Sequence, residues 1–187
     1  MKKVAVLLSD SYKELKNVKS LTLIAMFGAI SIILGYFTLV IGDFLKVGFS
    51  FLPNQFIYYL FGPIVGAVFG AAMDILTFFI RPTGSFFWGF TLNAILEGFI
   101  YGFALYRKPL TMKRIFLINI LDVILVKLVL TTYWLSILYG NGFFTILPIR
   151  ALKALIMLPI ETILLFTIIK GVEATGIFKP LNDKKFD

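Results

Sequence analysis

Long apolar segments, separated by short polar ones, run through nearly the whole chain of 187 residues. Hydrophobic residues make up 59% of the chain and charged residues only 15%, so most side chains face something other than water. The first, fifth and sixth runs are each long enough to cross a hydrocarbon core of roughly 30 Å. The sequence therefore predicts an all-α membrane protein. The apolar runs cover residues 20–40, 51–61, 63–80, 86–106, 114–138 and 146–170.

The stretch 51–80 is either one overlong helix or two short ones. Phe61-Gly62-Pro63 interrupts it with the two residue types least suited to a helix interior. Local chemistry alone would also allow a kink in a single helix. The distribution of basic residues decides between the two, because Lys and Arg concentrate in cytoplasmic loops.

Thirteen of the 18 basic residues lie in three places: before the first run, between the fourth and fifth, and after the sixth. These places must share one side of the membrane, so the stretch 51–80 crosses twice and turns near Gly62. We therefore predict six transmembrane helices with both termini in the cytoplasm. The thirteen residues are Lys2, Lys3, Lys13, Lys16, Lys19, Arg107, Lys108, Lys113, Arg114, Lys170, Lys179, Lys184 and Lys185. The expected segments are a cytoplasmic tail (1–18), a transmembrane domain (19–172) and a second cytoplasmic tail (173–187).

The composition excludes several classes of function. The chain has no cysteine and no histidine, which removes disulfides, thiolate nucleophiles, histidine bases and the usual zinc ligands. It carries no phosphate-binding loop and no paired nucleophile and base, so we expect no enzyme, no metal and no cofactor. The net charge of +8 is spread over loops between apolar runs, and nucleic acid is therefore not an expected partner.

Charged residues inside membrane segments are rare, and they mark a pathway, a binding site or an internal pair. Structural pairing is open for several of those found here, since a lone buried charge is costly. Glu97 is available to neutralise Lys127 or Lys153, and Glu161 to bond a backbone group after Pro159. The intramembrane charges are Asp74, Glu97, Asp122, Lys127, Arg150, Lys153 and Glu161.

Four cations lie on the predicted outer face, where few are expected. Arg150 and Lys153 are three apart and project from one face of the sixth helix. Arg81 ends the third helix, and Lys46 lies in the first outer loop. An anionic ligand arriving from outside is the simplest explanation for this cluster.

An aromatic cluster, Phe86-Phe87-Trp88-Gly89-Phe90, follows a Pro-Thr-Gly turn at the same level. An interfacial belt accounts for many such residues, but some of these rings must face inward, where a flat heteroaromatic ligand could stack. Asp74, about two turns from the outer end of its helix, is placed to accept paired hydrogen bonds from an amino-heterocycle.

Small residues form strips on two helices. Ala25 and Ala29, with Gly28 beside them, make a flat strip on the first helix, and Gly62, Gly66 and Gly70 form another. Such strips allow helices to approach closely in lipid. For the glycine strip we expect packing inside the bundle. For the alanine strip, internal packing and contact with a partner protein both remain open.

These features together resemble the substrate-binding S components of energy-coupling factor (ECF) vitamin transporters, and among them the folate-specific (FolT) type. The similarity covers about two thirds of the chain. Its most specific stretch is Pro-Thr-Gly-x-Phe-Phe-x-Gly-Phe-Thr, in which Trp88 stands where family members often have Pro. The stretches that carry it are Lys46-Val-Gly-Phe-Ser-Phe-Leu-Pro53, Phe61-Gly-Pro63, Asp74, Arg81-Pro-Thr-Gly-Ser-Phe-Phe-Trp-Gly-Phe-Thr91, Arg150-Ala-Leu-Lys153 and Leu158-Pro-Ile160.

The resemblance implies an S-component-like bundle in a bacterial plasma membrane that binds folate with high affinity. It implies docking on a membrane coupling protein with two cytoplasmic ATPases, with Ala25 and Ala29 at the interface. On this hypothesis Asp74 pairs with the pterin, Phe87 and Trp88 stack on the rings, and a lid at 42–52 closes from outside. The cations Arg81, Arg150 and Lys153 would meet carboxylates or ring oxygens, and the lid would include Lys46 and Phe49.

Three other functions remain open on the sequence. The chain is either an S component for another vitamin, such as riboflavin, thiamine or a queuosine precursor, or a membrane scaffold with no small-molecule ligand. A self-sufficient secondary transporter is the third, although the sequence shows no clear inverted repeat.

Overall fold

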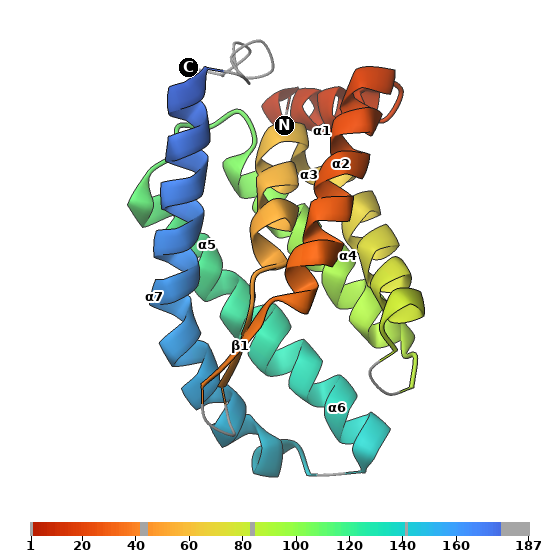
Figure 1. Cartoon of the computed structure of the whole chain (residues 1–187), viewed down its shortest axis with the longest axis vertical. Coiled ribbons are helices and arrows are strands. Elements are labelled where there is room, and N and C mark those ends of the chain that lie inside the picture. The colour runs from red at the N-terminus through yellow and green to blue at the C-terminus, as the bar shows by residue number, and fades with distance from the viewer. Residues whose placement is uncertain (1, 42–44, 83–84, 141, 177–187) are drawn as a thin grey trace.

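The computed structural model describes residues 2–41, 45–82, 85–140 and 142–176. The chain is a bundle of helices with one short antiparallel hairpin, and both ends of the described chain lie at the same end of the bundle (Figure 1). The elements are α1 (Lys2–Glu14), α2 (Val18–Tyr36), β1 (Thr38–Ile41), β2 (Leu45–Gly48), α3 (Phe51–Ile80), α4 (Trp88–Leu105), α5 (Met112–Asp122), the π-helix η1 (Val123–Leu130), α6 (Thr131–Tyr139) and α7 (Phe143–Thr175).

Within the described residues, four helices are long and apolar enough to cross a membrane: α2, α3, the continuous α5–η1–α6, and α7. The helix α3 is interrupted at Gly62, whose φ of 87° and ψ of −172° are not helical, and so supplies two segments. The apolar 18-residue α4 supplies another. The predicted all-α fold with six transmembrane helices is therefore confirmed.

The chain reverses direction at Gly62. A Cβ at Gly70 would lie 3.4 Å from the Tyr58 hydroxyl, whereas twelve residues of continuous helix would separate these positions by about 18 Å. The returning half of α3 then packs closely on α4, because a Cβ at Gly66 would lie only 2.4 Å from the Gly98 carbonyl oxygen. The glycine strip thus serves packing inside the bundle, as its spacing predicts.

The helix α1 lies across this turn (Figure 1), and its Ser11 side chain pairs with backbone groups that the turn leaves unpaired. The buried Ser11 hydroxyl donates to the Phe61 carbonyl oxygen (2.7 Å) and accepts from the amides of Ile64 and Val65. Beside it, Asp10 pairs with Arg107. Burial by itself raises the pKa of Asp10, but hydrogen bonds from Lys13 and Arg107 outweigh it and hold the pKa below its ordinary value. The first residues are therefore part of the packed structure.

The first half of α3, residues 51–61, forms the centre of the bundle. Its residues from Leu52 to Phe61 are nearly all buried, and eleven residues extend only about 16 Å. This segment therefore spans half a bilayer and is shielded from lipid by its neighbours. The chain reaches its start through the β1–β2 hairpin, which runs from the end of α2 toward α7 (Figure 1).

Replacing Gly62 with alanine should destabilise the bundle. The backbone there adopts a conformation nearly restricted to glycine, and the new Cβ would lie 2.8 Å from the Tyr106 ring. We predict a loss of about 1–3 kcal/mol in the free energy of unfolding, measured by thermal unfolding in detergent. Gly171→Ala is the matched control, because among the described residues no side chain or other packed element lies within 4 Å of its Cβ position. Equal stability of the two variants would contradict the reversal at Gly62.

Candidate functional site

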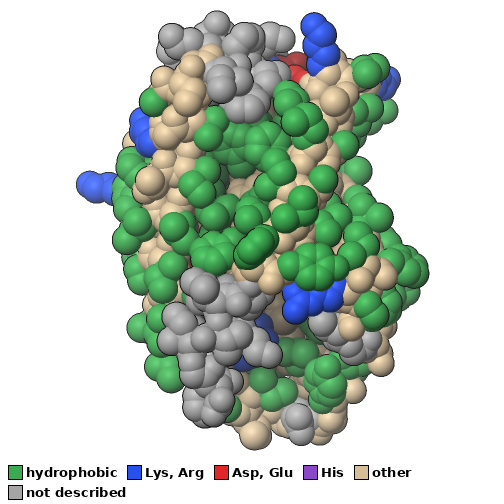
Figure 2. Space-filling view, viewed as in Figure 1, with side chains coloured by type: hydrophobic (Ala, Val, Ile, Leu, Met, Phe, Trp, Pro, Cys, Tyr) green, Lys and Arg blue, Asp and Glu red, His purple; other side chains and the backbone are tan. Residues whose placement is uncertain are grey.

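Three adjoining cavities hollow the end of the bundle opposite the termini, with volumes of about 360, 370 and 390 Å³. We name them the Asp74 cavity, the aromatic cavity and the Lys127 cavity. The first two share Asp74, Thr77 and Arg81 in their walls, and the first and third share Ser50. Figure 2 shows the hollow in the lower half of this face, with basic side chains at its edge. The three cavities therefore adjoin one another, and together we call them the vestibule.

Asp74 stands where the Asp74 cavity and the aromatic cavity meet. Its Oδ2 accepts a hydrogen bond of 2.6 Å from the Thr91 hydroxyl, which fixes the carboxylate. Among the described residues, Oδ1 has no hydrogen-bond partner. Across the cavity, Asn54 presents a buried Oδ1 that also lacks a partner among them. The cavity thus offers a half-used carboxylate and an amide oxygen, a set of acceptors suited to a ligand rich in N–H donors.

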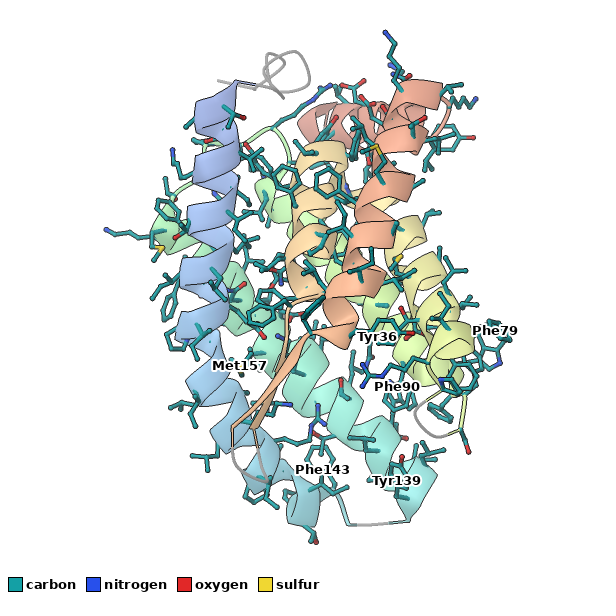
Figure 3. All side chains as sticks on the ribbon, viewed as in Figure 1. Tyr36, Phe79, Phe90, Tyr139, Phe143 and Met157 are labelled. Carbon is teal, nitrogen blue, oxygen red and sulfur yellow. The ribbon has the colours of Figure 1, made fainter. Side chains whose placement is uncertain are left out.

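Arg81 ends α3 at the mouth of the vestibule. Its guanidinium donates to the Gly35 carbonyl oxygen (2.9 Å) and lies over the Tyr36 ring, 5.5 Å from the centroid. Tyr36 lines the Asp74 cavity and Phe90 the aromatic cavity, whereas Phe79 points outward from the bundle (Figure 3). The end of α2 therefore holds Arg81 in the wall that two cavities share.

Aromatic residues from three helical segments line the aromatic cavity. Phe87 lies 5.6 Å from the ring of Trp134 and 5.9 Å from that of Phe90. Trp134 is fixed in turn by a hydrogen bond from its Nε1 to Asn93. Trp88 is 72% exposed and packs edge-on against Phe86, so its ring lies largely outside the cavity in this conformation. Phe87 and Trp88 are the two residues expected to stack on a ligand, and of these Phe87 lines the aromatic cavity.

The Lys127 cavity gathers Arg150, Lys153, Lys127 and Glu161 below the end of the hairpin. Arg150 and Lys153 line the same wall, in keeping with their spacing of three. The expected lid region is the β1–β2 hairpin and the connection to α3, and Phe49 lies in that connection between Gly48 and Ser50. Part of the expected lid, 42–44, lies outside the described residues, as do the Lys46 side chain and the 83–84 turn.

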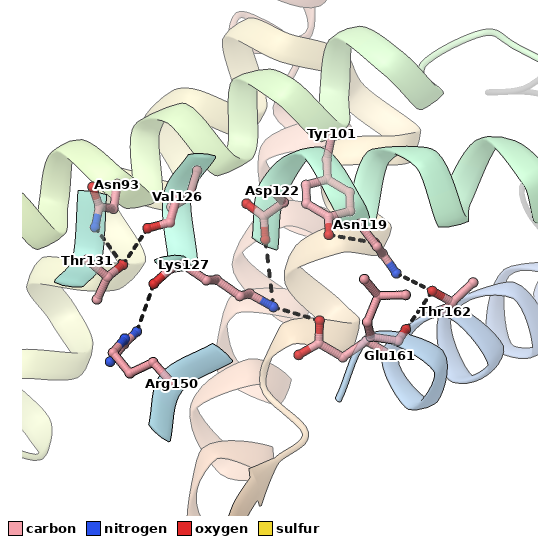
Figure 4. A network of polar contacts seen from close by, with 11 residues as sticks. Asn93, Tyr101, Asn119, Asp122, Val126, Lys127, Thr131, Arg150, Glu161 and Thr162 are labelled. Atoms are coloured by element: carbon pink, nitrogen blue, oxygen red, sulfur yellow. Dashed lines mark hydrogen bonds and ion pairs between the residues drawn. The ribbon is translucent and has the colours of Figure 1, made fainter. Parts of the chain in front are cut away.

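The π-helix η1 explains how the charges of the fifth span meet. Its i→i+5 hydrogen-bond pattern brings residues five apart toward one face, and Asp122 and Lys127 are five apart. Lys127 Nζ lies 3.7 Å from Asp122 Oδ2 and donates to Glu161 Oε2 at 2.6 Å. Arg150 donates to the Lys127 carbonyl oxygen at 3.1 Å (Figure 4). These charges thus form a network of ion pairs and hydrogen bonds between η1 and α7.

The structure settles two of the pairings left open by the sequence. Glu161 binds the Lys127 ammonium group, not a backbone group after Pro159. Glu97 lines the Asp74 cavity and makes no ion pair with Lys127 or Lys153 among the described residues. The sequence places a polar residue on a helix, but its partner depends on the orientation of each helix about its own axis. The π-helix alters the direction in which the side chains of the fifth span point.

Sequence reasoning missed two residues of the vestibule wall, Asn54 and Tyr58, and a third, Trp134, that packs against the wall residue Phe87. Tyr58 and Asn54 belong to the short central segment of α3, and Trp134 belongs to α6. A polar Asn54-Gln55 pair at the start of an otherwise apolar half-length helix was the available signal. Trp134 resembles any interfacial tryptophan in sequence, and only the packing of α6 against the start of α4 reveals its contact with Phe87.

Removing the lysine of the charged group should cost stability. Lys127→Met leaves Glu161 and the buried Asp122 without a cation, and we predict a loss of about 3 kcal/mol in unfolding free energy. Adding Glu161→Gln should recover much of this loss, because fewer buried charges then remain unpaired. Thermal unfolding of both variants measures the coupling. A double variant as unstable as Lys127→Met would contradict the pairing.

Comparisons with known proteins agree with this architecture. The family model for the ECF transporter, substrate-specific component, matches residues 19–181. The folate transporter FolT of Clostridium novyi (strain NT) is 32% identical over 163 residues, which are 87% of this chain and 95% of that protein. FolT of Leuconostoc mesenteroides subsp. mesenteroides is 28% identical over 151 residues, covering 78% of this chain and 81% of that protein.

Comparison with solved structures also identifies a folate transporter FolT as similar to this chain. The crystal structure of FolT bound with folic acid has a TM-score of 0.70 and 34% sequence identity to this chain, covering 80% of it and 90% of that chain. The sequence match extends over nearly all of the transmembrane region, and the vestibule lies within it. The chain belongs to the family of substrate-specific components of ECF transporters.

Proposed function

We propose that this chain is the folate-binding S component of an ECF importer. The observation that carries the proposal is the Asp74 carboxylate, held by Thr91 at the junction of two cavities, with one oxygen that no described residue bonds. A pterin presents an amino group and ring N–H groups along one edge, which suit such a carboxylate. The aromatic wall around Phe87 suits its flat rings. Binding and transport require no catalytic step by this chain.

The vestibule also suits the rest of a folate molecule. Its benzoyl-glutamate part ends in two carboxylates, and the Lys127 cavity places Arg150 and Lys153 on one wall. Ser50 lines both this cavity and the Asp74 cavity. A ligand with a donor-rich heterocycle at one end and carboxylates at the other therefore has complementary groups in two adjoining cavities.

The positive-inside rule supports an outward-facing vestibule in the plasma membrane of a bacterium. The loop with Arg107 and Lys108 lies at the same end of the bundle as α1 and the end of α7 (Figure 1). This end carries most of the basic residues and is the cytoplasmic one under the rule. The vestibule at the other end then receives folate from outside.

The exposed side of α2 suits the coupling protein that the family assignment implies, together with two cytoplasmic ATPases. Ala25 and Ala29 are exposed, whereas Gly28 between them is buried, and a Cβ there would lie 3.3 Å from the Met73 sulfur. Gly28 thus serves internal packing, and the two alanines remain available on the surface.

Replacing Asp74 with asparagine should weaken folate binding by about 1.5–3 kcal/mol, because an acceptor for charge-assisted hydrogen bonds is lost. This corresponds to about a 10- to 140-fold higher Kd, measured by calorimetry on the purified chain. The fragment para-aminobenzoyl-glutamate, which lacks the pterin, should bind both forms equally. Asp10→Asn, at the opposite end of the bundle, is the control. Unchanged folate affinity in Asp74→Asn would contradict the assignment.

A ligand screen separates the alternatives. Thermal shifts with folate, riboflavin, thiamine and a queuosine precursor should show the largest stabilisation with folate, since binding to the folded state raises Tm. Greater stabilisation by another vitamin would assign the chain to that vitamin. No stabilisation by any of them, with partner binding intact, would favour a scaffold.

A bulky residue on the alanine strip should block coupling without affecting ligand binding. We predict that Ala29→Trp abolishes folate uptake by the reconstituted complex and leaves the folate Kd of the isolated chain unchanged, because the side chain faces away from the vestibule. Leu117→Trp, at a 65% exposed position on α5, is the matched control. Full uptake by Ala29→Trp would place the interface elsewhere.

A further inference from the structure

A second concave site lies on the flank of the bundle, between α5 and α7. It is a groove of about 310 Å³ with an almost entirely apolar surface. The Thr162 hydroxyl, the one neutral polar group among its lining side chains, is turned to internal partners: it donates to the Leu158 carbonyl oxygen and accepts from Asn119. The lining residues are Met112, Lys113, Phe116, Pro159, Thr162 and Ile163.

The depth of this groove follows from the length of α7. At 1.5 Å per residue, positions 159–163 lie about 24–30 Å along the helix from Phe143. A hydrocarbon core that begins at the level of Phe143 extends about 30 Å along α7. The groove therefore lies inside the hydrocarbon edge at the end of the bundle that holds the termini. Lys113, at the start of α5, stands at the level of the lipid headgroups.

The cations around Lys113 are not neutralised by the acids of this end. Among the described residues Lys113, which is exposed, makes no hydrogen bond or ion pair. Arg114 bonds the Pro109 carbonyl oxygen, and Lys108 bonds that of Phe103. Burial and the charge of Arg114 both lower the pKa of Lys108.

The described acids at this end are bonded elsewhere. Asp10 binds Arg107 and Lys13, Glu14 accepts from Ser20, and Glu173 lies beside Lys170 and accepts from Tyr59. The groove thus combines a space for a hydrocarbon chain with an uncompensated positive charge at headgroup depth.

We propose that this groove binds an anionic phospholipid, with one acyl chain between Phe116 and Ile163 and the phosphate at Lys113. The charges of Lys108 and Arg114 add to the positive potential there. Such a combination favours an anionic headgroup over a zwitterionic one, since each basic residue near the surface attracts anionic lipid. This site is separate from the vestibule, and its occupancy does not depend on the identity of the transported vitamin.

The test uses the purified full chain in detergent, titrated with phosphatidylglycerol or phosphatidylcholine, with bound lipid counted by native mass spectrometry. The wild-type chain should retain one phosphatidylglycerol more tightly than phosphatidylcholine. Lys113→Gln should weaken phosphatidylglycerol binding about fivefold and reduce the preference for phosphatidylglycerol over phosphatidylcholine by the same factor. Ile163→Trp, which fills the groove, should weaken the binding of both.

Two matched variants serve as controls. Lys16→Gln removes another exposed lysine from the same end, and Leu155→Trp adds the same bulk at a 75% exposed position of α7. Both should bind phosphatidylglycerol as the wild type does, and circular dichroism establishes that all variants are folded. Equal retention of the two lipids by the wild type, or unchanged phosphatidylglycerol binding in folded Lys113→Gln and Ile163→Trp, would overturn the proposal.

Discussion

The reversal of α3 at Gly62 determines how the rest of the molecule is built. Backbone polar groups in a bilayer must be paired within the protein, and a turn inside a bundle exposes several of them at once. Ser11 of α1 pairs with three of these groups, and Tyr106 and Ser11 leave no room for a Cβ at Gly62. Because the first half of α3 is only half a bilayer long, the space beyond its other end becomes the vestibule.

The intramembrane charges divide into two groups with different consequences. Lys127 forms ion pairs with both Asp122 and Glu161, which reduces the cost of burying these charges and ties η1 to α7. Asp74 instead has, among the described residues, a single hydroxyl partner, which bonds one of its two oxygens. Asp74 and Glu97, which both line the Asp74 cavity, lie outside this ion-paired group among the described residues, and the free oxygen of Asp74 is the acceptor on which the proposed ligand contact rests.

The sequence predicts the number of spans well, because segments rich in Lys and Arg must lie on the same side of the membrane and an even number of crossings must therefore separate them. The same reasoning places Arg150 and Lys153 on one wall, since spacing on a regular helix fixes direction. It cannot predict the π-helix, which brings Asp122 and Lys127 together, or the hairpin, whose pairing depends on a turn between strands. The sequence also cannot predict the side-chain direction of Trp88. Packing contacts with neighbouring helices determine which of the adjacent aromatic rings at the start of α4 faces the cavity.

The helix α2 connects the surface where a coupling protein would dock to the mouth of the vestibule. Its exposed side carries Ala25 and Ala29, its buried Ser31 donates to the Ser50 carbonyl oxygen at 3.0 Å, and its Gly35 carbonyl holds Arg81. Ser50 and Arg81 both line the Asp74 cavity. A partner that binds the alanine strip therefore acts on a rigid element in direct contact with two parts of the vestibule wall. On the proposed interface, a displacement of this one helix would move both parts of the wall, because a packed helix shifts as a unit.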